Sequence, residues 1–399
     1  MDFDDTPEEA AFRAEVRALL APHARPEVLG VDAGGHDLAA TVAESRAWQR
    51  MLAQLGWAAP SWPREYGGRG LSFGQAFVWS QECSRAGRGR NLLMAGLEML
   101  GPTLIAHASD AQKQRFLEPT ARGEIMWCQL FSEPGAGSDL AALATRATLD
   151  GDDWIVNGQK LWSSFANHAD WGFLLVRSEP DRPKHAGITF LLVDMRTPGV
   201  EVRPLIEMTG GNHFNEVFFT DVRVPDALRV GARGNGWAIA RTTLGQERLS
   251  IGHLAPLEPV QRLFAHLAAR GVRSDSALAG EAAQLYAWAK GLDLLGARVL
   301  TKISRGENPS AEAALMKNAA GEVLGRLARI GLEASGADAL GASDEWQYRY
   351  LYAPSLHIGG GTDDVMKNVA AEQVLGLPRE PDPWKDTPFE ALPRGGAKR

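Results

Sequence analysis

Apolar side chains recur at helical spacing near the start of the chain, which predicts an amphipathic helix. The residues of this apolar face are Phe12, Val16, Leu19 and Leu20. Thr6 before Pro7 is typical of a helix N-terminus, because threonine caps free backbone N–H groups and proline suits the first turn. The helical pattern continues to about Gly123, and the Gly- and Pro-rich segment 60–70 interrupts it as an expected loop.

The pattern changes between about residues 124 and 236. Short runs of β-branched, aromatic and leucine residues alternate there with Gly, Asp, Asn and Pro, which predicts an antiparallel β domain. The clearest runs are residues 154–156, 173–176, 188–193 and 216–219. Between the first of these runs and Thr148, the sequence Asp150-Gly151-Asp152-Asp153 favours a hairpin turn.

Helical patterns return from Trp237 to about Gly376, with breaks near residues 271–276, 305–309, 335–343 and 354–362. We therefore expect an α+β fold with an N-terminal α-helical domain over residues 1–124, a central β domain over 125–236 and a C-terminal helical bundle over 237–385. A tail over 386–399 follows. The chain from Pro378 onward is rich in proline, glycine and charge, and we expect it to be poorly ordered.

Composition excludes several classes of protein. Of the 399 residues, 45% are hydrophobic and 23% are charged, as in ordinary globular proteins. The net charge of -7 disfavours sequence-independent binding to nucleic acid, which depends on excess Lys and Arg. The N-terminus lacks the basic and apolar regions of a signal peptide, and no apolar run reaches the roughly 18 residues of a membrane span, so we expect neither export nor membrane spanning.

The cysteines and histidines do not predict a metal or disulfide site. Cys83 and Cys128 are far apart and have no nearby Cys or His set, so neither a disulfide framework nor a zinc site is indicated, and we expect a cytoplasmic protein. His213 and His357 have no partner set that the sequence reveals. We therefore predict no bound metal.

Two sequence strings carry the candidate chemistry. Gln129–Asp139 (QLFSEPGAGSD) combines two glycines with a proline and two serines, so that backbone can approach a flat ligand while Ser132 and Ser138 offer hydroxyls. A lone glycine pair would more often be a plain turn, but the second string Asn157–Ser164 (NGQKLWSS) follows closely. Together the two strings resemble the flavin-binding signatures of the acyl-CoA dehydrogenase family.

The resemblance covers roughly residues 5–380. It includes Pro63–Gly68 (PREYGG), Glu216–Pro225 (EVFFTDVRVP) and Gly361-Thr362. It implies the family's fold, in which a central antiparallel β domain lies between an N-terminal α-helical domain and a C-terminal four-helix bundle. It also implies FAD as cofactor and an acyl-CoA thioester as substrate.

Position by position, the resemblance implies a set of cofactor contacts. Trp162 would lie against the flavin, and Ser164 stands where the family usually has a threonine near flavin N5. Ser138 would lie near both the flavin and the substrate. The whole implied set is Gln129, Phe131, Ser132, Gly137, Ser138, Trp162, Ser164, Arg273, Thr362 and Asp364.

The expected reaction forms a trans-2-enoyl-CoA, because a carboxylate removes the α-proton while a hydride passes from the β-carbon to flavin N5. Most family members carry the base in a late Glu-Gly-Thr triplet, but Gly360 stands at that position here. Glu247 in Leu244–Gly252 (LGQERLSIG) resembles the base of the family subset that uses a Glu-Arg helix. The alternatives are a solvated or ion-paired Glu247, with Asp363 or Asp364 as a weaker candidate base.

Other positions leave alternatives open. Arg248 aligns with a position near the acyl-CoA, although a packing or surface role is equally open. The family's pyrophosphate-binding arginine corresponds to either Arg270 or Arg273. Glu333–Ala337 (EASGA) departs from the family's Gln and Gly-Gly loop, and its glutamate would repel a pyrophosphate.

We therefore expect an FAD-dependent acyl-CoA dehydrogenase that passes electrons to an acceptor such as electron-transfer flavoprotein. It would assemble as a homo-oligomer, either a dimer or a tetramer. One alternative is an FAD-binding subunit of a hetero-oligomer that lacks some complete sites, because Gly-Gly-Gly-Thr chains resemble the paired enzymes of actinobacterial sterol side-chain degradation. Another is a flavin monooxygenase on the same fold.

Overall fold

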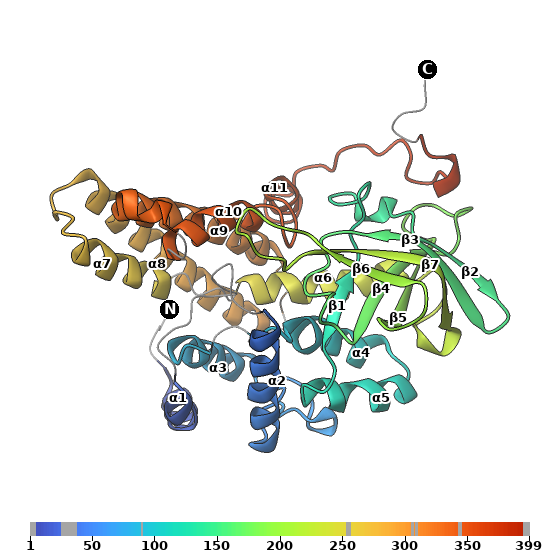
Figure 1. Cartoon of the computed structure of the whole chain (residues 1–399), viewed down its shortest axis with the longest axis horizontal. Helices are drawn as coiled ribbons and strands as arrows, with labels where there is room; N and C mark the ends of the chain where they lie inside the picture. The colour runs from blue at the N-terminus through green and yellow to red at the C-terminus, as the bar shows by residue number, and fades with distance from the viewer. Residues whose placement is uncertain are drawn as a thin grey trace.

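The computed structural model describes residues 5–24, 38–88, 91–252, 257–304, 307, 310–341 and 345–393. A helical bundle forms one end of the molecule and a twisted sheet forms the other (Figure 1). Helix α6 (Gly236–Gly252) runs between them and contacts both. The sequence of helical, β and helical parts agrees with the predicted fold class.

The first helical part begins as the sequence predicts. Its helices are α1 (Pro7–Leu20), α2 (Leu38–Gln54), α3 (Phe73–Arg85), α4 (Gly101–His107) and α5 (Asp110–Ala121). Thr6 caps α1 in a reciprocal capping box with Glu9, because each side chain accepts a hydrogen bond from the other residue's backbone. Phe12 and Val16 are buried in a small core with Trp57. A π-helical turn at Ala95–Leu100 leads into α4 and was not predicted.

The central part is a single eight-stranded sheet. Its strands are β1 (Trp127–Leu130), β2 (Arg146–Asp150), β3 (Asp153–Lys160), β4 (Trp171–Arg177), β5 (Ile188–Asp194), β6 (Val200–Pro204), β7 (Asn215–Pro225) and β8 (Arg229–Val230). The order is β6-β7-β3-β2-β4-β5-β8, with β1 paired to β4. Most pairs are antiparallel as predicted, but β1 and β2 each pair with β4 in parallel. The predicted hairpin turn joins β2 and β3.

The second helical part contains helices with the predicted breaks between them. After α6 come α7 (Leu257–Ala269), α8 (Ala277–Ser304), α9 (Ser310–Ser335), α10 (Glu345–Leu356) and α11 (Asp363–Gln373). Helices α7, α8, α9 and α10 share a core that includes Leu263, Leu285, Leu327 and Trp346. Helix α9 is central, because it contacts α6, α7, α8, α10 and α11.

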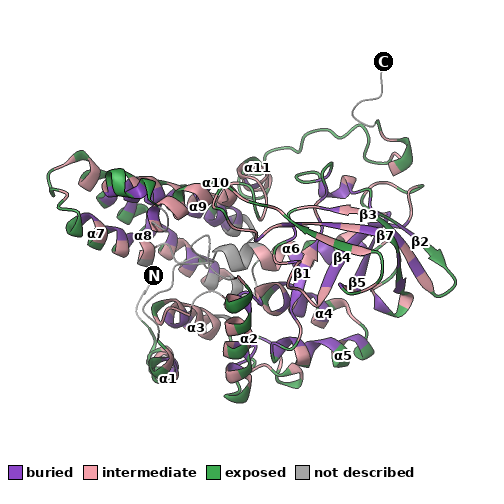
Figure 2. Cartoon of the chain, viewed as in Figure 1, coloured by how far each residue is buried: buried purple, intermediate pink, exposed green. Residues whose placement is uncertain are grey.

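The largest core joins the sheet to the helices beside it. It contains Trp62 and Leu100 from the first helical part, Trp127 and Phe190 from the sheet, and Ile239 from α6. Figure 2 shows buried residues in purple along β4 and β5 of the sheet and on α4 and α5 beside it. The two strings, Gln129–Asp139 and Asn157–Ser164, therefore lie beside this core.

The C-terminal tail corrects one expectation. Residues 374–386 are mostly exposed, but the segment around Phe389 docks on the β domain. Its backbone donates from Phe389 to the Arg182 carbonyl and from Glu390 to the Pro180 carbonyl. The prediction of a poorly ordered tail is therefore wrong for this segment, because composition does not reveal a docking site elsewhere in the fold.

Within the described part of the chain, no helix combines the length and the apolar character that crossing a bilayer requires.

Candidate functional site

The loop after β1 has a buried beginning and an open middle. Phe131 is buried, with its ring edge-on to Phe173 and Phe190 at centroid distances of 5.6 and 6.0 Å. A Cβ atom added to Gly135 or Gly137 would meet nothing within 4 Å. Ser138 is exposed beside them, and Ser132 is partly exposed. The loop thus presents small side chains to open space, as close contact with a flat ligand requires.

Two buried charges hold the start of this loop in place. Lys160 Nζ donates to Glu133 Oε1 at 2.7 Å and to the Phe131 carbonyl at 3.0 Å. Glu133 also accepts hydrogen bonds from the backbone N–H groups of Ala144 and Thr145. Burial lowers the pKa of Lys160 to about 8 although Glu133 opposes the shift. Burial also acts to raise the pKa of Glu133, but Lys160 and the hydrogen bonds outweigh it and the net shift is downward.

An exposed aromatic residue, Trp162, lies near the end of the second string. Trp162 has a left-handed backbone with a φ of 60° and is 57% exposed. Its ring meets Phe214 edge-on at 5.7 Å. The buried Ser163 Oγ has no hydrogen-bond partner among the described residues, and Ser164 is exposed beside it. An exposed indole, an unpartnered hydroxyl and an open glycine loop fit the flat, polar ring system of a flavin.

Glu247 lies beside Gln129, the first residue of the Gln129–Asp139 string. Gln129 Nε2 donates to Glu247 Oε2 at 3.4 Å, although the two residues are 118 positions apart. Glu247 is partly buried. One helical turn earlier, Thr243 is buried and shares a hydroxyl contact of 3.0 Å with Thr103 of α4, which fixes α6 against the first helical part. The side chain of Arg248 lies outside the described residues.

The late glycine loop turns with two left-handed residues and is clamped at its end. Gly360 and Gly361 have φ values of 69° and 103°. Asp363 accepts from the buried Lys317 Nζ at 3.0 Å and contacts His357 Nδ1 at 2.6 Å. Burial acts to raise the pKa of Asp363, but hydrogen bonds from His357 and Lys317 outweigh it and lower the pKa. A carboxylate that is held in this way is poorly suited to remove a substrate proton.

Two further predicted cofactor contacts lie at the start of α11. The Thr362 hydroxyl accepts a hydrogen bond from the Val365 N–H at 3.3 Å and so caps the helix. Asp364 is highly exposed and pairs with Lys367 at 3.1 Å. Both side chains therefore lie at a helix N-terminus and already have partners within the chain.

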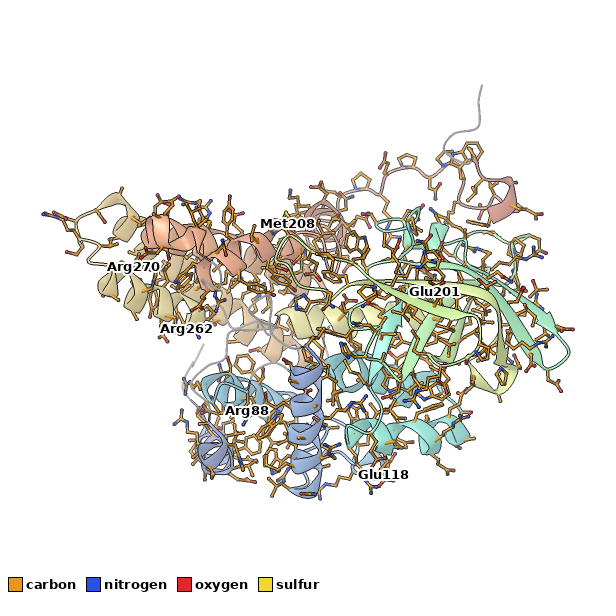
Figure 3. All side chains as sticks on the ribbon, in the orientation of Figure 1. Arg88, Glu118, Glu201, Met208, Arg262 and Arg270 are labelled. Carbon is orange, nitrogen blue, oxygen red and sulfur yellow. The ribbon has the colours of Figure 1, made fainter. Side chains whose placement is uncertain are left out.

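Arg270, one of the two predicted pyrophosphate-binding arginines, lies away from the loop after β1. Figure 3 places Arg270 at the outer end of the helical bundle, away from the sheet. Arg270 forms an ion pair with Asp338, and the exposed Arg273 pairs with Asp275 at 2.6 Å. Glu333 pairs with Arg329 at 2.6 Å. Each of these charged side chains is thus paired within its own helical region, and Arg270 lies apart from the loop after β1.

Sequence reasoning missed the partners of two histidines. His213 Nδ1 contacts Glu207 Oε2 at 2.9 Å, and His357 contacts Asp363 as described above. Neither partner is adjacent in sequence, so spacing alone could not reveal the pairs. Across the described ranges, no group of three or more His, Cys, Asp or Glu residues could hold a metal ion.

Three family models match the chain in succession. They describe the N-terminal domain of acyl-CoA dehydrogenases at residues 6–124, the middle domain at 128–222 and the C-terminal domain at 234–375. The middle-domain match includes both flavin-like strings, and the C-terminal match includes Glu247 and the late glycine loop.

Individual relatives agree with these matches. The chain is 38% identical to acyl-CoA dehydrogenase IpdE1 of Mycobacterium tuberculosis, over 92% of this chain and 98% of that protein. It is 41% identical to acyl-CoA dehydrogenase FadE34 of the same organism, over 92% of this chain and half of that longer protein.

Solved structures agree as well. The chain resembles the ChsE4-ChsE5 complex from Mycobacterium tuberculosis with a TM-score of 0.81 and 30% identity, over 95% of this chain and 100% of the matched chain. It resembles the Tcur3481-Tcur3483 steroid ACAD with a TM-score of 0.82 and 27% identity, again over 95% and 100%. The three domain matches and these relatives show that the chain belongs to the acyl-CoA dehydrogenase family, whose members are oxidoreductases acting on CH–CH bonds.

Proposed function

We propose that this chain is an FAD-dependent enzyme that oxidises the α,β carbon–carbon bond of an acyl-CoA thioester, with Glu247 as the base. The observation that carries the proposal is the contact between Gln129 and Glu247. It joins Gln129 of β1, just before the flavin-like loop at residues 131–143, to the one carboxylate that the sequence favours as base. Gly360 supports the same assignment, because glycine at the family's usual base position cannot accept a proton.

The proposal gives each residue of the site a separate role. Glu247 Oε takes the α-proton, and the Gln129 amide orients the carboxylate. FAD, when bound, supplies the acceptor for the β-hydrogen as hydride. The residues that would hold the ring system are Gln129, Phe131, Ser132, Gly137, Ser138, Trp162 and Ser164, with Thr362 and Asp364 near the glycine loop.

We propose a bulky, ring-bearing acyl group as the substrate class. The similarity to a steroid ACAD supports this choice, and so does the absence of a side chain at Gly360, where most family members carry a glutamate. The electron acceptor would be a soluble carrier such as electron-transfer flavoprotein.

A second candidate is that a homologous, different chain completes the cofactor site. Arg270 lies far from the flavin-like loop of its own chain (Figure 3), and Glu333 would repel a pyrophosphate. One of the similar solved structures is the ChsE4-ChsE5 complex, in which two different proteins are joined. In this case FAD binding would require co-expression with the second chain.

The test is an anaerobic titration of the purified protein with straight, branched and ring-bearing acyl-CoA esters, followed through the visible flavin bands. Bleaching by a ring-bearing ester supports both the reaction and the substrate class. Bleaching by short straight esters alone refutes the substrate class but keeps the reaction. Bound flavin that no ester bleaches favours the flavin monooxygenase or a substrate outside the panel, whereas FAD that appears only with a co-expressed homologue supports the second candidate.

A further inference from the structure

The flavin-like loop, defined here as residues 131–143, is anchored at its far end by Arg177 of β4. Arg177 Nη2 donates to the Ala141 carbonyl at 2.6 Å and to the Leu143 carbonyl at 3.2 Å. Its Nη1 donates to the Lys184 carbonyl at 2.6 Å. Arg177 is 2% exposed, and burial lowers its pKa to about 10. This guanidinium therefore ties the loop to the segment around Lys184.

The same segment holds the loop at a second point. Lys184 Nζ contacts both carboxylate oxygens of Asp139 at 2.8 and 2.9 Å, and Asp139 directly follows Ser138. Arg177 and Lys184 thus restrain the residues on the C-terminal side of the open glycines. Lys160 and Glu133 restrain the N-terminal side.

The C-terminal tail covers this anchor. The Phe389 ring lies over the Arg177 guanidinium, with its centroid 3.9 Å from Cζ. The Phe389 N–H donates to the Arg182 carbonyl at 2.9 Å, and the Glu390 N–H donates to the Pro180 carbonyl at 3.0 Å. The family's C-terminal model ends at residue 375, so this docked segment lies beyond the matched domains. Figure 1 shows the tail leaving α11 and reaching the sheet.

We propose that tail residues 388–391 are a positioning element for the flavin-like loop, with Phe389 acting through Arg177. The aromatic face shields the guanidinium from water, which strengthens its hydrogen bonds to Ala141 and Leu143. The backbone bonds to residues 180 and 182 hold the segment that carries Lys184. The proposal rests on the proposed function, because it takes this loop to be the place where FAD binds.

The test compares Phe389→Ala with Trp384→Ala, which removes a half-exposed aromatic residue from the same tail. Phe389→Trp retains a ring over Arg177 and serves as the conservative variant. Two quantities are measured in the full-length protein: amide hydrogen exchange of residues 139–145 in the FAD-free state, and the dissociation constant for FAD. Far-UV circular dichroism checks that each variant is folded.

Phe389→Ala is expected to speed exchange in this segment and to weaken FAD binding by roughly 3- to 30-fold, the range between an exposed and a desolvated cation–π contact. Trp384→Ala should change neither quantity, and Phe389→Trp should keep both the exchange rate and the FAD dissociation constant near their wild-type values. Unchanged exchange in Phe389→Ala, or an equal effect from Trp384→Ala, overturns the inference. If the wild-type protein binds no FAD, the proposed function fails. The exchange comparison does not require FAD, so it still decides whether Phe389 positions the loop.

Discussion

Replacing Lys160 by methionine should destabilise the β domain strongly. The Lys160 side chain is 0% exposed and its ammonium makes two hydrogen bonds, to Glu133 and to the Phe131 carbonyl. Methionine preserves much of the side-chain volume but leaves the buried Glu133 carboxylate without its counter-ion. Removing one partner of a buried ion pair typically costs about 3–5 kcal/mol.

The expected cost is near the lower end of that range, at about 3 kcal/mol. Glu133 keeps its two backbone N–H donors, Ala144 at 2.6 Å and Thr145 at 2.9 Å, which continue to stabilise its charge. The measurement is a urea titration that is followed by far-UV circular dichroism in wild type and variant.

Lys184→Met is the matched control. Lys184 pairs with Asp139, whose side chain is 58% exposed, and surface pairs of this kind contribute at most about 1 kcal/mol. Combining Lys160→Met with Glu133→Gln should recover part of the loss, because the uncompensated charge is then absent. A cost for Lys160→Met no greater than that for Lys184→Met would refute the view that this buried pair supports the loop.

Three further outcomes follow from the glycine loop and the helix contacts. Gly360→Glu places a side chain on a left-handed residue and should cost about 1–3 kcal/mol in thermal or urea unfolding; no destabilisation would contradict the observed turn. Asp363→Asn should lower the free energy of unfolding by about 2 kcal/mol above pH 5. Because the folded protein lowers the pKa of Asp363 below 3.8, the difference between wild type and variant should shrink as the pH falls below 3.8. A difference that does not shrink there would contradict the lowered pKa. Gly101→Ala should lower the free energy of unfolding by about 1–3 kcal/mol, because the added Cβ would lie 1.9 Å from Trp62 Cζ2. Gly280→Ala is the control: its Cβ would meet nothing within 4 Å, so the change should be neutral or stabilising.

Much of the fold could be predicted because local patterns and local structure agree. The capping residues of α1, the turn between β2 and β3 and the breaks between the long helices all follow from short-range chemistry. The parallel pairing of β1 with β4 could not be predicted, because a short apolar run pairs with whatever strand the tertiary fold brings beside it. The docking of Phe389 on Arg177 was missed for the same reason.

The candidate site was only partly readable. The two strings indicated a flavin-like loop, but no sequence spacing reveals that Gln129 contacts Glu247. A signal for Lys160 did exist, because it lies in phase with the inward-facing Trp154 and Val156 of β3 and is therefore a charge at a core position. Its partner Glu133 could not be identified without the fold.

The anaerobic rate of flavin bleaching in Glu247→Gln tests the central claim most directly. The variant should retain FAD, because its amide still fits beside Gln129, but should bleach about 100- to 10,000-fold more slowly than wild type with the best ester. Glu118→Gln makes the same chemical change at an exposed carboxylate of α5, outside the proposed site, and should keep the full rate. Undiminished bleaching in Glu247→Gln, or an equal loss in Glu118→Gln, would contradict the assignment of Glu247 as the base.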